Sequence, residues 1–566
     1  MSPMPKNSTF PEKYLHESGY ELSLDLNHIA VAYASAQELD RNQTREQILH
    51  LGSWELEQAS EERNVVVNHT QRVLWLRSKK PLSSESLLDL QELVGHQLDW
   101  VGPVYEFPPD VSRNPICLLP DRMVVGLMKD SIELAQNIDQ LLLEHFGLIN
   151  CYEITRYLGG FRLFLLPREM RWANGSKNIF DIRQLLLKNE FVGKGIRAAM
   201  IDSMPMLRHT PPRPRDKKEH RFPPQFDKLF NSPVIQGDGT GIQVAVIDAE
   251  GFELSHPALQ AAFVAGRRFY DNGMPNGGED NSPAAAQGNS GNHGTRCAGI
   301  IGARPVTTAD PSYMVGMAPG CSIVPLYVTG YVKSLVAAAI GYAVDIDADV
   351  ISISDSEVGL DGSDPATNPV AKKIDFAYTE GTLICAATMN ANLNDIHYPA
   401  GHVNVMACGA SDFSNDRCNP CVDGWGSNYG NSMSVAALGL AIKTTGLSNT
   451  YTTLDGTSAA TPQVAALAAI LISTFPVLKG DPQTTKNIIE QSAQKVGRTT
   501  VDAADNPVCP AGLGLTYSTA KMNGGWEREL GYGIITVAGA IQTAQQMLGA
   551  ATDTTPPSAP SGLRIQ

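Results

Sequence analysis

The sequence predicts an α/β protein with a largely parallel sheet flanked by helices, preceded by an α+β region. Hydrophobic residues make up 43% and charged residues 18% of the 566-residue chain, which is the composition of a globular protein. From residue 241 onward, apolar strand-like runs alternate with helical runs, as in sheets of parallel strands. Before residue 204 the runs include a β-α-β-β-α-β series, which is typical of the split βαβ, ferredoxin-like motif.

Residues 1–115 are expected to form an N-terminal α+β region. Two strand-like runs, Tyr20–Leu26 and His28–Ala34, precede a charged helical pattern from Gln37 to about Glu57. Residues 116–203 are expected to form a ferredoxin-like module, with two helices on one face of an antiparallel sheet. Its expected elements are, in order, a strand at Arg122–Met128, a helix at Ser131–Phe146, strands at Ile149–Arg156 and Phe161–Leu166, a helix at Phe180–Asn189 and a strand at Ile196–Ile201.

The rest of the chain is expected to hold a linker, a larger domain and a tail. Residues 204–231 are rich in Pro and Arg and cannot bury a core, so we interpret them as an exposed linker. Residues 232–549 contain the alternating runs of the α/β domain. These runs are Ile242–Ile247, Thr295–Ile301, Ser322–Val328, Ser334–Val344, Val350–Ile353, Thr382–Ala387 and Val403–Ala407. Residues 550–566, rich in Pro and Ser, resemble the entry into a fibronectin type III module.

Charge and hydrophobicity narrow the partners that we expect. The net charge of −15 disfavours nucleic acid and anionic membranes, because phosphate binding needs an excess of Lys and Arg. The longest apolar stretch, Val464–Leu471, is far shorter than the ~20 residues of a membrane-spanning helix. The first 30 residues contain no apolar segment of the kind found in secretory signals. We therefore expect a cytoplasmic protein, or export by a route that needs no N-terminal signal.

The nine Cys residues do not form the framework of a disulfide-rich fold, because they are few and scattered. The pair Cys418 and Cys421 lacks two further metal ligands, so an exposed loop that can form a disulfide is favoured over a zinc site. Asp345, Asp347 and Asp349 begin like a calcium loop, but Val350 stands where that loop needs Gly. No metal ligand is therefore assigned.

Three polar residues stand where catalytic groups are often found. Asp248 ends a buried strand, at the edge of a parallel sheet where sites are built. His293 stands where a Gly-bounded loop enters an apolar helix, and Ser458 starts another buried helix, whose positive end favours a developing oxyanion. Each residue alone is more often a cap or a turn residue. Together, their order and contexts match one of the known chain orders of the Ser-His-Asp triad.

From about residue 240 to 549 the sequence resembles the subtilases, the subtilisin-like serine peptidases. Three motifs carry the resemblance: VAVIDAEGFELSHP at 244–257, GNHGTRCAGIIG at 291–302 and LDGTSAATPQVAALAAIL at 454–471. The resemblance implies a subtilisin-like fold in which Asp248 orients the base, His293 takes and returns the proton, and Ser458 attacks the scissile carbonyl. Subtilases often carry structural calcium, which the resemblance allows but does not place. No other cofactor is expected.

The resemblance also implies a donor for the oxyanion. In the family this donor is an Asn nine positions after a Gly at the start of a strand of small residues, which corresponds here to Asn390 after Gly381. Asn392 is the reserve candidate. Without the resemblance, the alternative interpretation is that Asn390 only caps a loop.

The sequence departs from the family pattern at the substrate site. Met389 stands where family members usually have Gly, and His397 stands where they have a small residue, so both are expected to crowd the first specificity pocket. The strand that pairs with the substrate backbone corresponds to Ser354, Asp355 and Ser356, and the acidic Asp355 is expected to favour a basic substrate residue. We expect a restricted preference at P1, the residue whose carbonyl is attacked. The alternative is that the loops rearrange and these side chains point away.

The ferredoxin-like module resembles the prosegments of subtilases, which suggests that it acts as an intramolecular inhibitor or chaperone. Self-cleavage in the linker is the expected consequence, with a permanent regulatory domain as the alternative. We expect a serine endopeptidase that cleaves protein or peptide substrates through an acyl-enzyme. The alternatives are a catalytically silent peptide-binding scaffold and a processing or macrocyclising transpeptidase.

Overall fold

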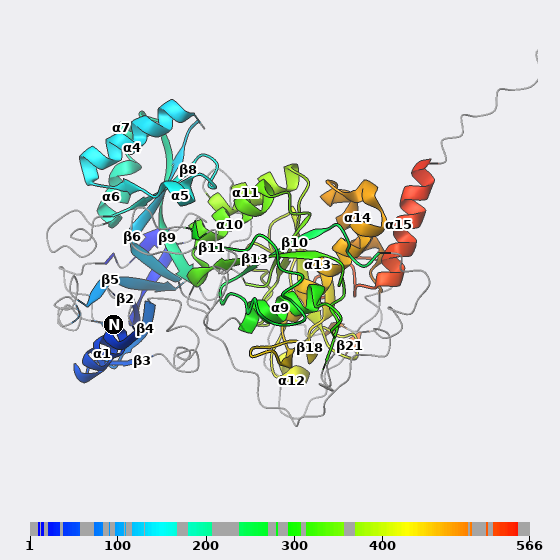
Figure 1. The fold of residues 1–566 in the computed structure, drawn as a ribbon. Helices are drawn as coiled ribbons and strands as arrows, with labels where there is room; N and C mark the ends of the chain where they lie inside the picture. Colours follow the sequence, from blue (N-terminus) through cyan, green and yellow to red (C-terminus); the bar gives the residue numbers. More distant parts are fainter. Residues whose placement is uncertain are drawn as a thin grey trace, which may run out of the picture.

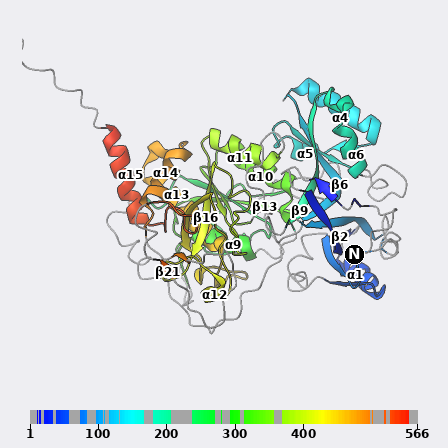
Figure 2. The same ribbon diagram turned by 180° about the vertical axis from the view of Figure 1, so that it is seen from behind.

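The computed structural model places two groups of secondary structure side by side, an N-terminal sheet and a larger α/β domain (Figure 1). Helix α15 lies at the end of the α/β domain farthest from the N-terminal sheet (Figure 2). The residues described are 10–11, 13–15, 21–33, 38–56, 73–82, 90, 97–106, 108, 116–129, 131–166, 179–205, 237–269, 279–280, 292–306, 313–355, 368–495, 499–500, 517–518 and 525–552. The 206–236 segment, most of the expected linker, and the expected tail from 553 onward lie outside them.

The N-terminal sheet has nine strands within the described residues. They are β1 (Lys13–Leu15), β2 (Glu21–Tyr33), β3 (Trp54–Leu56), β4 (Val73–Ser78), β5 (Leu98–Glu106), β6 (Ile116–Leu127), β7 (Ile149–Asn150), β8 (Phe161–Leu165) and β9 (Ile196–Pro205). Their order is β3-β4-β2-β5-β6-β8-β7, with β1 paired to β2 and β9 paired to β6, and all pairs are antiparallel. The antiparallel N-terminal sheet that the sequence predicts is confirmed.

Eight of these strands form two units with the same strand order. Helix α4 (Ile132–Phe146) follows β6, and α6 (Ile179–Leu186) with the short α7 (Asn189–Val192) lies between β8 and β9, so this unit is β-α-β-β-α-β with strands ordered β9-β6-β8-β7. In the first unit α1 (Glu38–His50) follows β2, and the strands are ordered β5-β2-β4-β3. Both orders are those of the split βαβ motif. The pairing of β5 with β6 joins the units into one sheet.

The expected elements differ from the structure in three places. The two expected strands between residues 20 and 34 are one strand, β2, with a bulge between Leu24 and Ile29. The expected helix over 37–57 ends at His50, because Gly52 takes a left-handed conformation before β3 begins. The expected strand over 149–156 shortens to β7 and a helical turn, α5 (Tyr152–Thr155). There the buried Thr155 hydroxyl donates to Asn150 and accepts from the backbone of Leu163, which competes with strand pairing.

The α/β domain is built on an eight-stranded sheet within the described residues. Its strands are β10 (Gln243–Asp248), β11 (Arg267–Phe269), β12 (Glu279–Asp280), β13 (Ser322–Val328), β14 (Val350–Ile353), β15 (Leu383–Ala387), β16 (Val405–Ser411) and β17 (Met433–Leu438). The order is β12-β11-β13-β10-β14-β15-β16-β17, and every pair except β11 with β12 is parallel. The largely parallel sheet that the sequence predicts is confirmed.

Helices cover both faces of this sheet. Helices α9 (Asn292–Gly302), α13 (Thr457–Thr474), α14 (Pro482–Ser492) and α15 (Val537–Thr552) share one core, and α10 (Lys333–Asp345) and α11 (Pro369–Thr379) share the other. Because side chains alternate along a strand, Val244 and Val246 of β10 join the first core, whereas Ala245 and Ile247 join the second. Small elements are η3 (Thr329–Tyr331), η4 (Pro476–Leu478), α12 (Pro420–Asp423) and the pairs β18 (Ile442–Thr445) with β19 (Tyr451–Leu454) and β20 (Thr499–Thr500) with β21 (Tyr517–Ser518).

Helix α13 is the central helix of the first core. Among the described residues, α13 is the one helix that is long and apolar enough to span a membrane by length and composition. Its mean hydropathy is 1.3 over 18 residues. Yet 89% of this window is buried inside the protein, which is typical of the core helix of a globular domain. Its apolar composition is therefore explained by packing.

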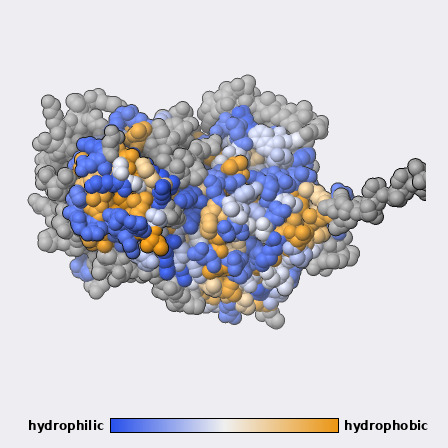
Figure 3. Space-filling view, turned by 90° about the horizontal axis from the view of Figure 1, so that it is seen from above, coloured by the Kyte–Doolittle hydropathy of each residue, from blue (hydrophilic) through white to orange (hydrophobic). Residues whose placement is uncertain are grey.

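The second N-terminal unit packs on α10 and α11. The ring of Tyr157 lies edge-on against Phe269 and Tyr342, at centroid distances of 6.0 and 6.1 Å. The carboxylate of Asp202 on β9 accepts a hydrogen bond from the Ser334 hydroxyl at 2.5 Å, at the start of α10. These contacts join the second N-terminal unit to the α/β domain. Other apolar side chains of the N-terminal part stay exposed, and Figure 3 shows hydrophobic surface there.

Candidate active site

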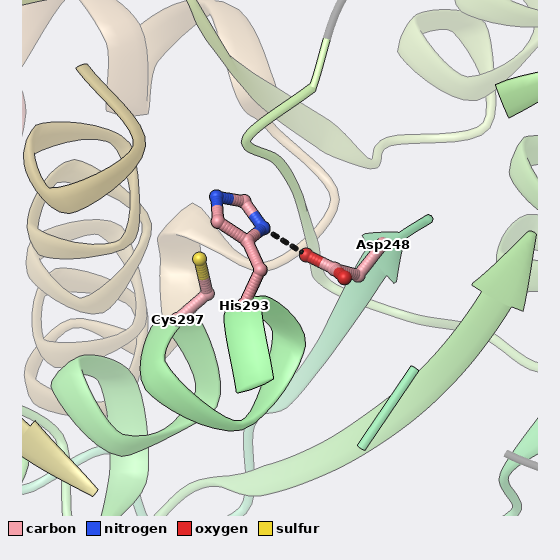
Figure 4. A group of neighbouring side chains, drawn as sticks. All are labelled: Asp248, His293 and Cys297. Atoms are coloured by element: carbon pink, nitrogen blue, oxygen red, sulfur yellow. Dashed lines mark hydrogen bonds and ion pairs between the residues drawn. The ribbon is translucent and has the colours of Figure 1, made fainter. Parts of the chain in front are cut away.

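Asp248 and His293 meet at the carboxyl end of β10. Asp248 is the last residue of β10 and is fully buried, and His293 lies in the first turn of α9 with its side chain 19% exposed. Nδ1 of His293 and Oδ2 of Asp248 are hydrogen bonded at 2.6 Å (Figure 4). The other carboxylate oxygen, Oδ1, accepts from the backbone N–H of Glu250 at 2.9 Å. The carboxylate is thus held on both sides and fixes one nitrogen of the imidazole.

The glycine after His293 is needed for this approach. A Cβ atom at Gly294 would lie 2.4 Å from the carbonyl oxygen of Gly251 and 3.0 Å from the carboxyl carbon of Asp248. The 2.4 Å approach to a backbone oxygen is too short for any side chain, so only Gly lets α9 pack this closely against the turn after β10. The His-Gly pair in the sequence therefore has a local steric reason.

Ser458 lies in the first turn of α13 and is 8% exposed. Its hydroxyl donates a hydrogen bond to the carbonyl oxygen of Ser354 at 3.1 Å. Its own carbonyl oxygen accepts from the Ser354 hydroxyl at 3.3 Å and from the Cys297 thiol at 3.6 Å. Ser458 is therefore attached both to the end of β14 and to α9.

Cys297 connects Ser458 with the Asp248–His293 pair. It lies one helical turn after His293, and both side chains project from the same part of α9 (Figure 4). Its sulfur and one ligand atom each of Asp248 and His293 all lie within 4.8 Å of one another. Since the same sulfur contacts the backbone of Ser458, the three residues of the expected triad gather around this thiol.

Asn390 is attached to the same end of α13. Its amide oxygen accepts from the backbone N–H of Thr457 at 2.9 Å and from the Thr457 hydroxyl at 3.1 Å. The amide NH2 group therefore remains as the donor end, next to the residue that precedes the expected nucleophile. Asn392, in contrast, accepts from the guanidinium of Arg417 at 2.7 Å, and its backbone N–H donates to Gly426. Of the two, Asn390 is the one whose amide is bonded to the residue before Ser458.

The charges around His293 raise its pKa. Burial by itself lowers the pKa of the imidazole, but Cys297, Asp248 and Asp355 together with the hydrogen bond to Asp248 raise it well above its usual range. Burial raises the pKa of the Cys297 thiol to about 12, so Cys297 acts on His293 as an anion only at strongly alkaline pH, whereas the carboxylates act at neutral pH as well. The two carboxylates are therefore the groups that stabilise the imidazolium form.

Of the expected substrate strand, Ser354 and Asp355 are described, and Ser356 lies outside the described residues. One carboxylate oxygen of Asp355 accepts from the backbone N–H of Ala249 at 3.1 Å, so this side chain is directed to the turn after β10. The carbonyl oxygen of Asp355 accepts from the Tyr331 hydroxyl at 3.0 Å. Asp355 is therefore bonded to the residue that follows Asp248.

Met389 and His397 are both buried near the Asn390 loop. Met389 has φ = +82°, a left-handed conformation that favours Gly, and its carbonyl oxygen accepts from Asn428 at 2.7 Å. His397 is 1% exposed, and its ring nitrogens have no hydrogen-bond partner in the described part of the chain. Burial lowers the pKa of His397 to about 4, so its 3.8 Å approach to Asp395 is not an ion pair at neutral pH.

Asp248, His293 and Cys297 are also the one group of possible metal ligands found among the described residues. Their arrangement fits proton transfer better than metal binding. The 2.6 Å contact between His293 and Asp248 holds a proton, and the Cys297 thiol has a raised pKa, whereas a metal ligand must be deprotonated.

The expectation that Cys418 lies in an exposed loop is wrong. Cys418 is fully buried and carries a free thiol, whose pKa is raised well above its usual range by burial and by neighbouring carboxylates. Its backbone N–H donates to the carbonyl oxygen of Ala410 in β16, which places it in the core. The thiol therefore behaves as a small apolar core residue.

Sequence reasoning missed two residues of the site, Cys297 and Glu250. Cys297 stands four positions after His293, the spacing that places two side chains on one face of a helix. Glu250 is two positions after Asp248, in the same turn, and one of its carboxylate oxygens accepts from the backbone N–H of His293 at 3.1 Å. The helical spacing from His293 could have identified Cys297 in the sequence. Glu250 can be recognised only from the folded turn.

Comparison with known proteins identifies the family of this chain. The profile of the subtilase family, Peptidase S8, matches residues 239–533, the range that contains Asp248, His293 and Ser458. The chain belongs to the subtilase family. Its enzyme class is that of the subtilisin-like serine endopeptidases, which are hydrolases of peptide bonds.

This subtilase is similar to several named enzymes. It is 33% identical over 270 residues to thermitase from Thermoactinomyces vulgaris, covering 46% of this chain and 84% of thermitase. It is 30% identical over 288 residues to subtilisin DY from Bacillus licheniformis, covering 47% of this chain and 92% of that enzyme. The solved structure of fervidolysin from Fervidobacterium pennivorans is similar in fold, with a TM-score of 0.51 at 20% identity over 77% of this subtilase and 62% of fervidolysin. The subtilisin-like fold is therefore confirmed.

Proposed function

We propose that this subtilase cleaves peptide bonds through an acyl-enzyme formed on Ser458. The observation that carries the proposal is the 2.6 Å hydrogen bond between Asp248 and His293, one helical turn from the thiol that contacts Ser458. Asp248 holds the imidazole in the tautomer whose second nitrogen can accept a proton. The substrate is a protein or peptide, as the family implies.

In the proposed first step, the Ser458 hydroxyl turns from the carbonyl of Ser354 to His293 and attacks the scissile carbonyl. His293 accepts the hydroxyl proton and then gives it to the leaving amine. We assign the amide NH2 of Asn390 and the N–H groups at the start of α13 as donors to the negative charge that forms on the carbonyl oxygen, because Asn390 is bonded to Thr457, the residue before Ser458. Water then repeats the sequence, with His293 as the base, and releases the acid product.

A fluorophosphonate probe tests this proposal, because it reacts with an activated serine hydroxyl and not with an ordinary one. We expect labelling of the wild type and loss of labelling in Ser458→Ala. Ser492→Ala at the end of α14 is the matched control and should label as the wild type does. Labelling that persists in Ser458→Ala, or a wild type that does not label, contradicts the proposal. The second outcome favours the silent scaffold, which the resting bond of Ser458 to Ser354 would suit.

We further propose that the ferredoxin-like module, residues 116–203, acts on the catalytic domain, residues 232–549, as an intramolecular inhibitor or chaperone. The contacts of Asp202 and Tyr157 with α10 and its surroundings support this proposal. Wild-type protein is expected to be shortened within residues 204–231, whereas Ser458→Ala stays at full length. Mass spectrometry of both proteins measures this, and equal masses contradict self-cleavage.

A separate experiment distinguishes hydrolysis from transpeptidation. The masses of the products that form in the presence of a peptide with a free amine show whether water or the amine releases the acyl group.

A further inference from the structure

We propose that Glu250 is a positioning residue that holds His293 for the reaction. The inference rests on the function proposed above. Three hydrogen bonds form a closed ring: the backbone N–H of His293 donates to Glu250 at 3.1 Å, the backbone N–H of Glu250 donates to Asp248 at 2.9 Å, and Asp248 is bonded to the His293 ring at 2.6 Å. Glu250 therefore connects the main chain of the base with the carboxylate that orients its side chain.

The position of Glu250 at the start of α9 gives this bond a physical role. The first N–H groups of a helix have no acceptor within the helix, and a side-chain oxygen that accepts one of them fixes the helix start. The Glu250 carboxylate does so at His293 itself, the residue whose ring must keep its place during proton transfer. A carboxylate there also offsets the positive end of the helix dipole, which otherwise disfavours the imidazolium formed during the reaction.

The turn that carries Glu250 is itself held on both sides. The backbone N–H of Ala249 donates to Asp355 at 3.1 Å, and the carbonyl oxygen of Gly251 packs where a side chain on Gly294 would otherwise lie. The Glu250 carboxylate also interacts with the guanidinium of Arg296, whose pKa it raises against the lowering effect of burial. Its bond to the His293 N–H directs the Glu250 side chain to the start of α9.

A helix cap with a purely structural role would act on stability and leave turnover of the folded enzyme unchanged. A positioning role would lower kcat, since misalignment of the base by a fraction of an ångström slows proton transfer, and leave KM nearly unchanged. The two roles therefore differ in the kinetic parameter that changes.

Two substitutions at Glu250 separate these roles. Glu250→Ala removes the acceptor, and we expect kcat to fall by about tenfold or more with little change in KM. Glu250→Gln keeps an oxygen that can accept the His293 N–H, and we expect it to restore most of the lost kcat. Glu253→Ala is the matched control, since Glu253 lies three residues further along the chain and, among the described residues, its bond to α9 runs from its backbone N–H to the Thr295 hydroxyl.

All variants are compared by initial rates on one fluorogenic peptide, with enzyme concentration set by titration with the fluorophosphonate. An unchanged kcat in Glu250→Ala overturns the inference, and so does a Glu250→Gln enzyme as slow as the Ala variant. A lower unfolding temperature with normal kcat per titrated site assigns Glu250 a structural role and also overturns it. If the wild type does not label, the proposed function fails instead, so the two failures are distinguishable.

Discussion

The amide oxygen of Asn390 accepts two hydrogen bonds from Thr457, the residue before Ser458. The end of the loop that carries Asn390 is thereby fixed to the helix that carries the proposed nucleophile. A donor and a nucleophile that are joined in this way keep their separation as the rest of the cleft adjusts to substrate. This preorganisation is what makes an oxyanion donor effective.

We expect Asn390→Ala to lower kcat by about 10²–10³-fold, the size measured for such a donor in a subtilisin, with KM little changed. The loss falls on kcat because the negative charge on oxygen exists only in the transition state. Asn392→Ala is the comparison, because its side chain is bonded to Arg417 and its loss should affect stability instead. Steady-state kinetics on one peptide measures both. A larger loss of kcat in Asn392→Ala would reassign the donor.

The raised pKa of His293 predicts activity that increases above neutral pH. His293 must be unprotonated to accept the Ser458 proton, so a pKa above its usual 6.5 moves the acid limb of kcat/KM to higher pH. Asp355→Asn removes one of the carboxylates that stabilise the imidazolium, while the amide oxygen can still accept from Ala249. We therefore expect the acid limb to move to lower pH in this variant.

The pH profile of kcat/KM from pH 5 to pH 10 measures this shift. Glu380→Gln, an exposed carboxyl at the end of α11, is the control and should leave the profile unchanged. An acid limb in Asp355→Asn at the wild-type position, or at higher pH, would show that Asp355 does not act on His293.

Met389→Gly tests the expected crowding of the P1 pocket. Met389 is the residue before Asn390 and has φ = +82°, a conformation that costs a non-glycine residue roughly 1–2 kcal/mol. Glycine removes both the strain and the side chain, so we expect a broader P1 preference with the fold retained. Cleavage of a peptide library, read by mass spectrometry, gives the preference of both enzymes. The same P1 profile in both would show that Met389 points away from the substrate.

The sequence predicted what depends on local pattern. The Asp248, His293 and Ser458 motifs were recognisable because each requires particular neighbours, and Gly294 shows why: no side chain fits against Gly251 there. The parallel sheet was predictable from its continuous apolar strands, such as β10 and β15.

Features that depend on distant partners could not be predicted. Glu250 became part of the site only when the turn after β10 met the start of α9. The repeat of this strand order in residues 21–106 was not predicted, because β3 has only three residues. Thr155 ended a predicted strand through bonds to Asn150 and Leu163, and the latter lies on another strand of the sheet.

The buried carboxyl of Asp202 predicts how pH affects the contact between the N-terminal sheet and α10. Burial raises the pKa of Asp202, although Arg122, Ser334, Lys333 and Ser203 act in the opposite direction. A carboxyl whose pKa is higher in the folded state contributes stability at low pH that is lost as the pH rises through the folded pKa. We therefore expect this contact to weaken with rising pH, above the ordinary 3.8 of an Asp.

Asp202→Asn and Asp202→Ala test this expectation in a Ser458→Ala background, which prevents self-cleavage. The Asn variant can still accept from the Ser334 hydroxyl and carries no charge, so it should lose this part of the pH dependence and keep the contact. The Ala variant leaves Ser334 without its acceptor, and we expect a loss of about 2 kcal/mol in the free energy of unfolding. Urea denaturation at pH 4.5 and pH 7.5 measures both, with the exposed Glu133→Gln on α4 as control. Equal pH dependence in the wild type and Asp202→Asn would assign the effect to another group, because the amide at position 202 cannot titrate.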